Sequence, residues 1–164
     1  MCVFHLSSAQ FDTFVAEFPT KKSSLNFLQF GLAQKSGVIP FYKSKNDLIE
    51  SLSSTAGDEY NPEPHLWAPV MDFDSFRRVN QHDWVDVLKA DIESAEFDML
   101  LNMDLKHLRV TQVLIEFHSR WYKDGWNAQK NIYKRMEDAG YKVVHEGPRN
   151  EEVVFLRTVP LPPQ

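Results

Sequence analysis

The sequence has little that would support a disulfide framework or a membrane span. Its 164 residues contain one cysteine, Cys2, which excludes an internal disulfide and a zinc site built from several thiolates. No apolar run approaches the roughly 20 residues that a membrane-spanning helix requires. Residues 1–6 lack the basic and long apolar regions of a secretory signal. We therefore expect a soluble domain, cytoplasmic by default if the chain begins at its natural start.

Clustered positive charge is also scarce. Lys and Arg number 18 against 23 Asp and Glu, which gives a formal net charge of −5, and the basic residues are scattered. Because nucleic-acid binding requires a basic patch, we expect no nucleic-acid partner. The 43% hydrophobic and 13% aromatic content is typical of a folded protein. The length predicts one domain, placed at residues 1–158, followed by a proline-rich tail at residues 159–164.

Two hydrophobic patterns alternate along the chain. Short apolar and β-branched runs predict strands at residues 2–6, 25–32, 37–43, 66–71, 84–91, 110–117, 141–144 and 153–156. Helical periodicity predicts helices at residues 11–18, 73–79, 97–101 and 128–139, the last ending at Gly140. The polar residues 44–64 predict a surface loop with one helical turn at 48–52, long enough to be a lid or substrate loop. This order predicts an α/β domain with a mostly parallel sheet and a closing antiparallel hairpin.

Ionisable residues follow the predicted strand that ends near residue 91. They are Lys89, Asp91, Glu93 and Glu96. Since α/β proteins bind ligands at the carboxyl ends of their strands, we expect these side chains to line a site. Three nearby carboxylates can hold a divalent cation, or raise the pKa of one carboxyl until it acts as a base. Two alternatives stay open: an ion-pair network with Lys89, or helix-dipole complementation by Glu93 and Glu96.

The predicted strand at residues 110–117 also runs into a carboxylate and an imidazole. Glu116 and His118 share a strand face because side chains alternate along a strand. Such a pair can act as an acid and a base or provide two metal ligands. A histidine at a strand end is also commonly a structural hydrogen-bonding residue. Both interpretations remain open from spacing alone.

Residues 86–96, Asp-Val-Leu-Lys-Ala-Asp-Ile-Glu-Ser-Ala-Glu, resemble the Lys-x-Asp-x-Glu-Gly-x-Glu hallmark of FkbM-type methyltransferases. Residues 31–42, 68–74 and 113–118 agree with that family in order and spacing. The resemblance covers most of residues 2–157. It implies a Rossmann-like class I methyltransferase sheet of seven strands, mostly parallel with a C-terminal antiparallel hairpin, and S-adenosylmethionine as the cofactor.

The resemblance also implies roles for individual residues. The implied catalytic residues are Lys89, Asp91, Glu93, Glu116 and His118, with Glu96 on the acceptor side. The implied cofactor-binding residues are His5, Gly31 and Asp91. No resident metal is implied. The acceptor class stays open between small molecules, sugars and lipids, and the sequence does not indicate the oligomeric state.

One element of the family pattern is missing. FkbM-type enzymes begin with a strand and an Asp-x-Gly-x-x-x-Gly turn whose backbone approaches the cofactor, and no segment here has two glycines at that spacing. The predicted strand at residues 2–6 corresponds to the family's second strand. We therefore expect a domain that lacks its first, central strand and binds the cofactor weakly or not at all. Ser94, which replaces the family's glycine, is a smaller departure that can also cap the next helix.

The sequence thus predicts a fragment of an O-directed methyltransferase that retains the acceptor half of the site. Two other functions stay open. The first is a non-catalytic methyltransferase-like protein that keeps the fold to bind a partner. The second is a divalent-metal hydrolase whose ligands are Asp91, Glu93, Glu96 and His118.

Overall fold

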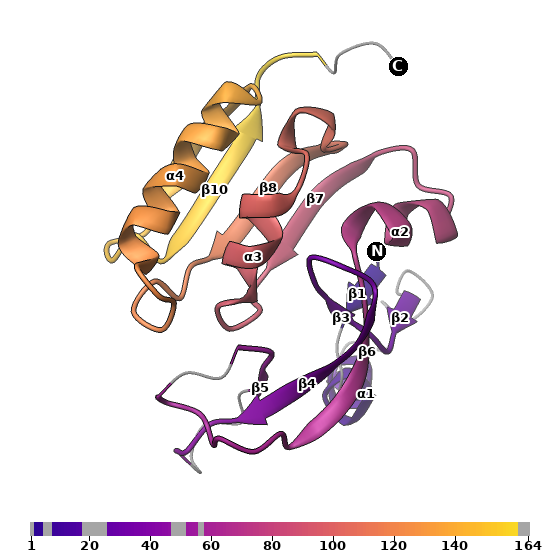
Figure 1. Ribbon diagram of the computed structural model, residues 1–164. Coiled ribbons are helices and arrows are strands. Elements are labelled where there is room, and N and C mark those ends of the chain that lie inside the picture. Colours follow the sequence, from indigo (N-terminus) through magenta and orange to yellow (C-terminus); the bar gives the residue numbers. More distant parts are fainter. Residues whose placement is uncertain (1, 5–7, 18–25, 47–51, 56–57, 161–164) are drawn as a thin grey trace.

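The computed structural model describes residues 2–4, 8–17, 26–46, 52–55 and 58–160, which form an α/β protein (Figure 1). Its elements are β1 (Cys2–Phe4), α1 (Ser8–Glu17), β2 (Asn26–Leu28), β3 (Gly31–Leu32), β4 (Gly37–Lys43), β5 (Leu52–Ser53), β6 (Leu66–Met71), α2 (Phe73–Val79), β7 (Val85–Ala90), α3 (Ala95–Asn102), η2 (Leu105–His107), β8 (Val110–Glu116), α4 (Gly125–Asp138), β9 (Tyr141–Glu146) and β10 (Glu152–Arg157). Predictions for His5 and for residues 6, 18, 25, 48–51 and 161–164 fall outside the described residues. The domain boundary at residue 158 stays a prediction.

The sheet that carries the predicted site has the strand order β7-β8-β10-β9. β7 and β8 are parallel, with Val85 opposite Val110 and Ala90 opposite Ile115. β10 runs antiparallel to both β8 and β9, so the predicted C-terminal hairpin is confirmed. Because β7 and β8 are parallel neighbours, their carboxyl ends meet at one edge of the sheet.

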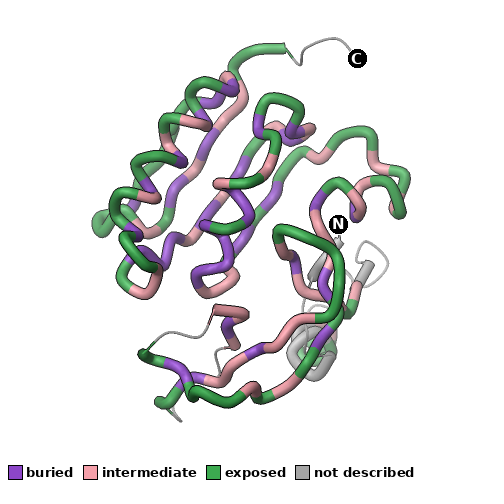
Figure 2. The backbone as a smooth tube through the Cα atoms, in the orientation of Figure 1, coloured by how far each residue is buried: buried purple, intermediate pink, exposed green. Residues whose placement is uncertain are grey.

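Helices α3 and α4 cover one face of this sheet and bury its core (Figure 1). Buried residues follow β8, β10 and the inward sides of the two helices (Figure 2). Ile132 and Met136, one turn apart on α4, are fully buried and face strand residues such as Val113 and Phe155. Burying one such side chain contributes about 1.5–3 kcal/mol. Gly140 has φ = +85° just after α4, which confirms the predicted helix stop.

The prediction of one mostly parallel sheet is not met by the described residues. They form two four-stranded mixed sheets with one parallel pair each, and a separate parallel pair of β1 and β2. In the second sheet, ordered β3-β6-β4-β5, only β3 and β6 are parallel. Parallel neighbours are usually joined by a helical crossover, whereas the described residues between β4 and β6 carry the short strand β5 and no helix, and β6 pairs antiparallel with β4. The predicted strand at 25–32 is also divided into β2 and β3.

Strand β7 ends its sheet, and its outer edge has no strand partner among the described residues. Val87, at its centre, is 51% exposed although the pattern of this strand is apolar. An open edge of this kind presents unpaired backbone groups to a further strand. In the described part of the chain, no helix has both the length and the apolar character to cross a membrane.

Candidate functional site

A sharp turn between β7 and α3 carries two of the predicted site residues, Asp91 and Glu93. Glu93 (φ = 53°) and Ser94 (φ = 78°) both have left-handed backbone conformations, which bring the chain from the strand into the helix within four residues. This conformation costs a non-glycine residue roughly 1–2 kcal/mol. The Ser53 hydroxyl donates a 2.6 Å hydrogen bond to the Glu93 carbonyl and stabilises the turn. Ser94 makes no capping hydrogen bond with its side chain, contrary to the proposed capping role.

A buried carboxylate fixes the second strand end. Glu96 is fully buried in the first turn of α3, and His118, two residues beyond β8, is 7% exposed. The His118 backbone N–H donates to Glu96 Oε1 at 2.8 Å, and the imidazole Nδ1 lies 3.1 Å from the same oxygen. This pairing favours the tautomer with a proton on Nδ1. The other ring nitrogen, Nε2, faces the carboxylates that follow β7.

Asp91, Glu93 and His118 converge at the adjoining ends of β7 and β8. His118 Nε2 lies 3.4 Å from Glu93 Oε2 and 3.8 Å from Asp91 Oδ1. One donor atom from each of the three residues lies within 4.8 Å of the others. Lys89 Nζ is 3.8 Å from Asp91 Oδ2, but both side chains are substantially exposed. The structure therefore joins three of the predicted catalytic residues in one cluster, with Lys89 at its rim.

The electrostatics of this cluster favour positive charge. Burial lowers the pKa of His118, but the hydrogen bond to Glu96 and the charges of Glu96, Glu93 and Asp91 outweigh it and raise the pKa above the ordinary histidine value. Burial and the nearby charge of Asp91 raise the pKa of Glu116. The charges of His118 and Lys89 offset this rise in pKa only in part. Glu116 lies near the cluster without joining it. It pairs across the sheet with Glu152.

Aromatic side chains form a wall beside the cluster. Trp121 stacks on the His118 ring with centroids 4.9 Å apart. The guanidinium carbon of Arg120 lies over the Trp121 ring, 4.7 Å from its centroid. The Tyr60 hydroxyl donates to Glu93 Oε2 at 3.3 Å, and the Tyr60 ring meets Trp121 edge to face. A cavity of about 150 Å³ adjoins this wall and is lined by Thr55, Asp58, Glu59, Tyr60, Ser94, Arg120 and Trp121.

Tyr60 is the site residue that the sequence did not predict. It lies in the polar segment 44–64, which we expected to be a surface loop, and no periodicity marks it as buried. Its 4% exposure and its contacts with Glu93 and Trp121 place part of that segment against the cluster. The suggestion of a substrate loop agrees with this position and stays a prediction.

The other predicted site residues are not among the three that converge. Gly31 is in β3 of the second sheet, opposite Val70. His5 is outside the described residues. Glu96, which the hydrolase alternative counts as a metal ligand, instead uses Oε1 to hold His118. The roles of all these residues remain predictions.

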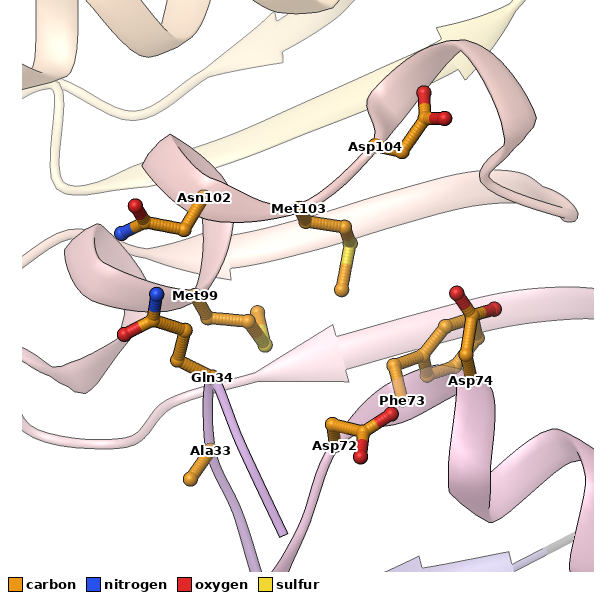
Figure 3. Close-up of a pocket in the computed structure, with 9 residues that line it drawn as sticks. All are labelled: Ala33, Gln34, Asp72, Phe73, Asp74, Met99, Asn102, Met103 and Asp104. Carbon is orange, nitrogen blue, oxygen red and sulfur yellow. The ribbon is translucent and has the colours of Figure 1, made fainter.

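A second cavity, of about 180 Å³, contains none of the predicted site residues (Figure 3). Its lining comes from the segment after β3, the start of α2, and the C-terminal part of α3 with the loop beyond it, as Ala33, Gln34, Asp72, Phe73, Asp74, Met99, Asn102, Met103 and Asp104. Asp72 in this lining caps α2 by accepting a hydrogen bond from Ser75 N at 2.9 Å. The Ser36 hydroxyl donates to the same carboxylate at 2.6 Å and links the two walls.

Comparison with known proteins gives one family. A family model described as "Methyltransferase FkbM domain" matches residues 14–143. The matched range includes Asp91, Glu93, Glu96 and His118, as well as Tyr60. No curated protein and no solved structure matches the chain significantly.

Proposed function

The chain belongs to the FkbM methyltransferase domain family, and from this premise we propose that it is the acceptor-binding part of an S-adenosylmethionine-dependent, O-directed methyltransferase. One observation carries the proposal beyond the family: Asp91, Glu93 and His118 converge at the carboxyl ends of two parallel strands. This is the edge at which α/β proteins bind their ligands. The acceptor is a hydroxyl of a small molecule, sugar or lipid.

The proposed role of the cluster is to orient the acceptor hydroxyl and receive its proton. Carboxylates accept hydrogen bonds only, so a hydroxyl near Asp91 and Glu93 would direct its proton toward one of them. The buried Glu96–His118 pair would keep the two carboxylates in place through His118 Nε2. Fixing the orientation of the oxygen and removing its proton are the two contributions that these residues can make to the reaction.

The described residues suit the acceptor better than the cofactor. S-adenosylmethionine, when bound, supplies a methyl group on a positively charged sulfur. Close approach of a backbone to such a molecule favours glycine. Among the described residues, the nearest glycine in sequence to Asp91 is Gly125, in α4, where an added Cβ would meet the backbone of Ser119. The cofactor is therefore assigned to a segment outside the described residues.

We further propose that this segment completes one Rossmann-like sheet. The open edge of β7 supports this, because a strand placed there would extend the β7-β8-β10-β9 sheet. The parallel pair of β1 and β2 would then lie on its other side. In this arrangement the parallel pair of β1 and β2 and the parallel pair of β7 and β8 become parts of one class I methyltransferase sheet.

A labelled-methyl assay tests the proposed function. The natural full-length gene product would be incubated with S-adenosylmethionine labelled in the methyl group and with separate small-molecule, sugar and lipid acceptors. We expect alkali-stable label in at least one hydroxyl-bearing acceptor, as a methyl ether. Binding of S-adenosylmethionine without label in any acceptor class would favour the non-catalytic alternative and contradict the proposal.

A further inference from the structure

We propose that Asp91, Glu93 and His118 bind a divalent transition-metal cation, of the class of Mn²⁺ or Zn²⁺. The three residues offer one imidazole nitrogen and two carboxylate oxygens within 4.8 Å of one another. Ligand atoms held at about 2.1 Å around one metal lie roughly 3 to 4.2 Å apart. The separations of 3.4 and 3.8 Å from His118 Nε2 to the two carboxylates fall in that range.

The histidine is prepared as a ligand by a residue behind it. Metal-bound histidines usually donate their second ring N–H to a carboxylate or carbonyl, which fixes the tautomer and the ring orientation. Here Glu96 Oε1 receives both the His118 backbone N–H and the contact from Nδ1. Trp121 stacks on the ring with an interplanar angle of 13° and limits its rotation. Nε2 is thereby held toward Asp91 and Glu93.

An unpaired buried carboxylate oxygen provides a second, independent indication of missing positive charge. Glu96 is 0% exposed, and its Oε2 has no hydrogen-bond partner among the residues that the structure describes. Three carboxylates, from Asp91, Glu93 and Glu96, surround a single imidazole. A charged His118 balances one of them, and Lys89, at the exposed rim 3.8 Å from Asp91, balances a second. This leaves one carboxylate of the three without a counter-charge, and the fully buried Glu96 is the costliest place for it. A bound divalent cation would supply the remaining positive charge.

The donor set selects the kind of cation. Mg²⁺ and Ca²⁺ prefer sites made entirely of oxygen, whereas imidazole together with carboxylates suits Mn²⁺, Fe²⁺ and Zn²⁺. Three protein ligands also leave coordination positions open, as in catalytic metal sites. The 150 Å³ cavity adjoins the cluster through Ser94, whose buried hydroxyl has no described partner. On the proposed methyltransferase function, an acceptor hydroxyl would take an open position, and this last step rests on that function.

Calorimetry on metal-free protein tests the site without cofactor or acceptor. We expect one Mn²⁺ or Zn²⁺ per chain, at least about 10-fold weaker binding in Asp91→Asn, and 10- to 100-fold weaker binding in Glu96→Gln. Asp104→Asn is the matched control, because Asp104 forms an exposed pair with His107 at 2.8 Å and lies outside the cluster. Its affinity should equal that of the wild type. Equal affinities for the wild type and Asp91→Asn would overturn the proposal.

Nuclear magnetic resonance of the unmodified protein keeps the test valid if a variant does not fold. Zn²⁺ should shift the ring signals of His118 first, while those of the exposed His107 and His145 follow only at higher concentration. Shifts confined to the exposed histidines would contradict the site. Neither experiment contains S-adenosylmethionine, so the two proposals can fail separately. Absence of metal binding would overturn the metal site and not the methyltransferase proposal. Absence of methyl transfer would overturn the methyltransferase proposal and not the metal site.

Discussion

His118 and Glu96 are joined through a single oxygen, because Glu96 Oε1 accepts the His118 backbone N–H at 2.8 Å and lies 3.1 Å from Nδ1 of the same residue. The two residues come from different elements, the first turn of α3 and the segment after β8. This link holds the end of one strand to the helix that follows its parallel neighbour. It therefore positions the cluster of Asp91, Glu93 and His118 and also contributes to stability.

Glu96→Ala should destabilise the protein. The substitution leaves the buried backbone N–H and Nδ1 of His118 without their acceptor, which costs about 1–3 kcal/mol per unsatisfied group. Urea denaturation should show a lower free energy of unfolding. The control is Glu137→Ala, an exposed position in α4, which should change it by less than about 0.5 kcal/mol. Equal effects at the two positions would show that the link to His118 contributes nothing.

Gly125→Ala should also destabilise, because an added Cβ would lie 2.1 Å from the Ser119 carbonyl oxygen. Backbone cannot yield as a flexible side chain can, so the segment that carries His118 and Trp121 would have to move. We expect a loss of about 1–3 kcal/mol in thermal or urea unfolding. Gly37→Ala provides a matched control, since nothing lies within 4 Å of an added Cβ there. A stability equal to that of Gly37→Ala would contradict the close approach.

The Asp72 cap should give a stability contribution that disappears in acid. Partial burial raises the pKa of Asp72, but hydrogen bonds from Ser36 and Ser75 outweigh it and hold the pKa below the ordinary aspartate value. The ionised carboxylate therefore stabilises the fold above the unfolded-state pKa of about 3.9, and the stabilisation is lost as pH falls through the lowered folded-state pKa. Near neutral pH, Asp72→Ala should cost about 0.5–2 kcal/mol.

Urea unfolding between pH 7 and pH 3 measures this dependence. The difference between wild type and Asp72→Ala should narrow toward the acid end of the range. Asp86→Ala, on the exposed part of β7, controls for the loss of one negative charge. A difference for Asp72→Ala that does not change with pH would show that the charge of the cap is not involved.

Calorimetry with S-adenosylmethionine should detect weak binding or none by the present chain. An added Cβ at Gly37, Gly125, Gly140 or Gly147 would not meet Asp91, and β7 has an open edge among the described residues. Binding should appear in the natural full-length gene product if it carries the strand that completes the sheet. Micromolar affinity of the 164-residue chain would contradict the assignment of the cofactor to another segment.

The sequence predicted the strand ends of this site well because their signal is local. The apolar run before Asp91 and the β-branched run before Glu116 predicted β7 and β8, and the stripe that includes Ile132 and Met136 predicted α4. The sheet arrangement was harder to predict, since it depends on which distant strands pair. The residue order alone does not reveal that β6 lies between β3 and β4.

The pairing of the charged residues was only partly predictable. Strand periodicity placed Glu116 and His118 on one face, but the chain leaves the strand after Glu116 and His118 turns to Glu96 instead. Tyr60 had no signal at all, because its burial depends on a contact with Trp121, 61 positions away in the chain. Long-range contacts of this kind require the three-dimensional structure.

The most direct test of the site is methyl transfer by Asp91→Asn in the natural full-length protein, measured beside wild type and Asp86→Asn. The two substitutions remove the same charge, one inside the cluster and one on the exposed part of β7. If Asp91 orients the acceptor and receives its proton, its substitution should lower kcat about 100- to 10,000-fold, with Asp86→Asn close to wild type. Equal rates for the two variants would show that the reaction takes place elsewhere.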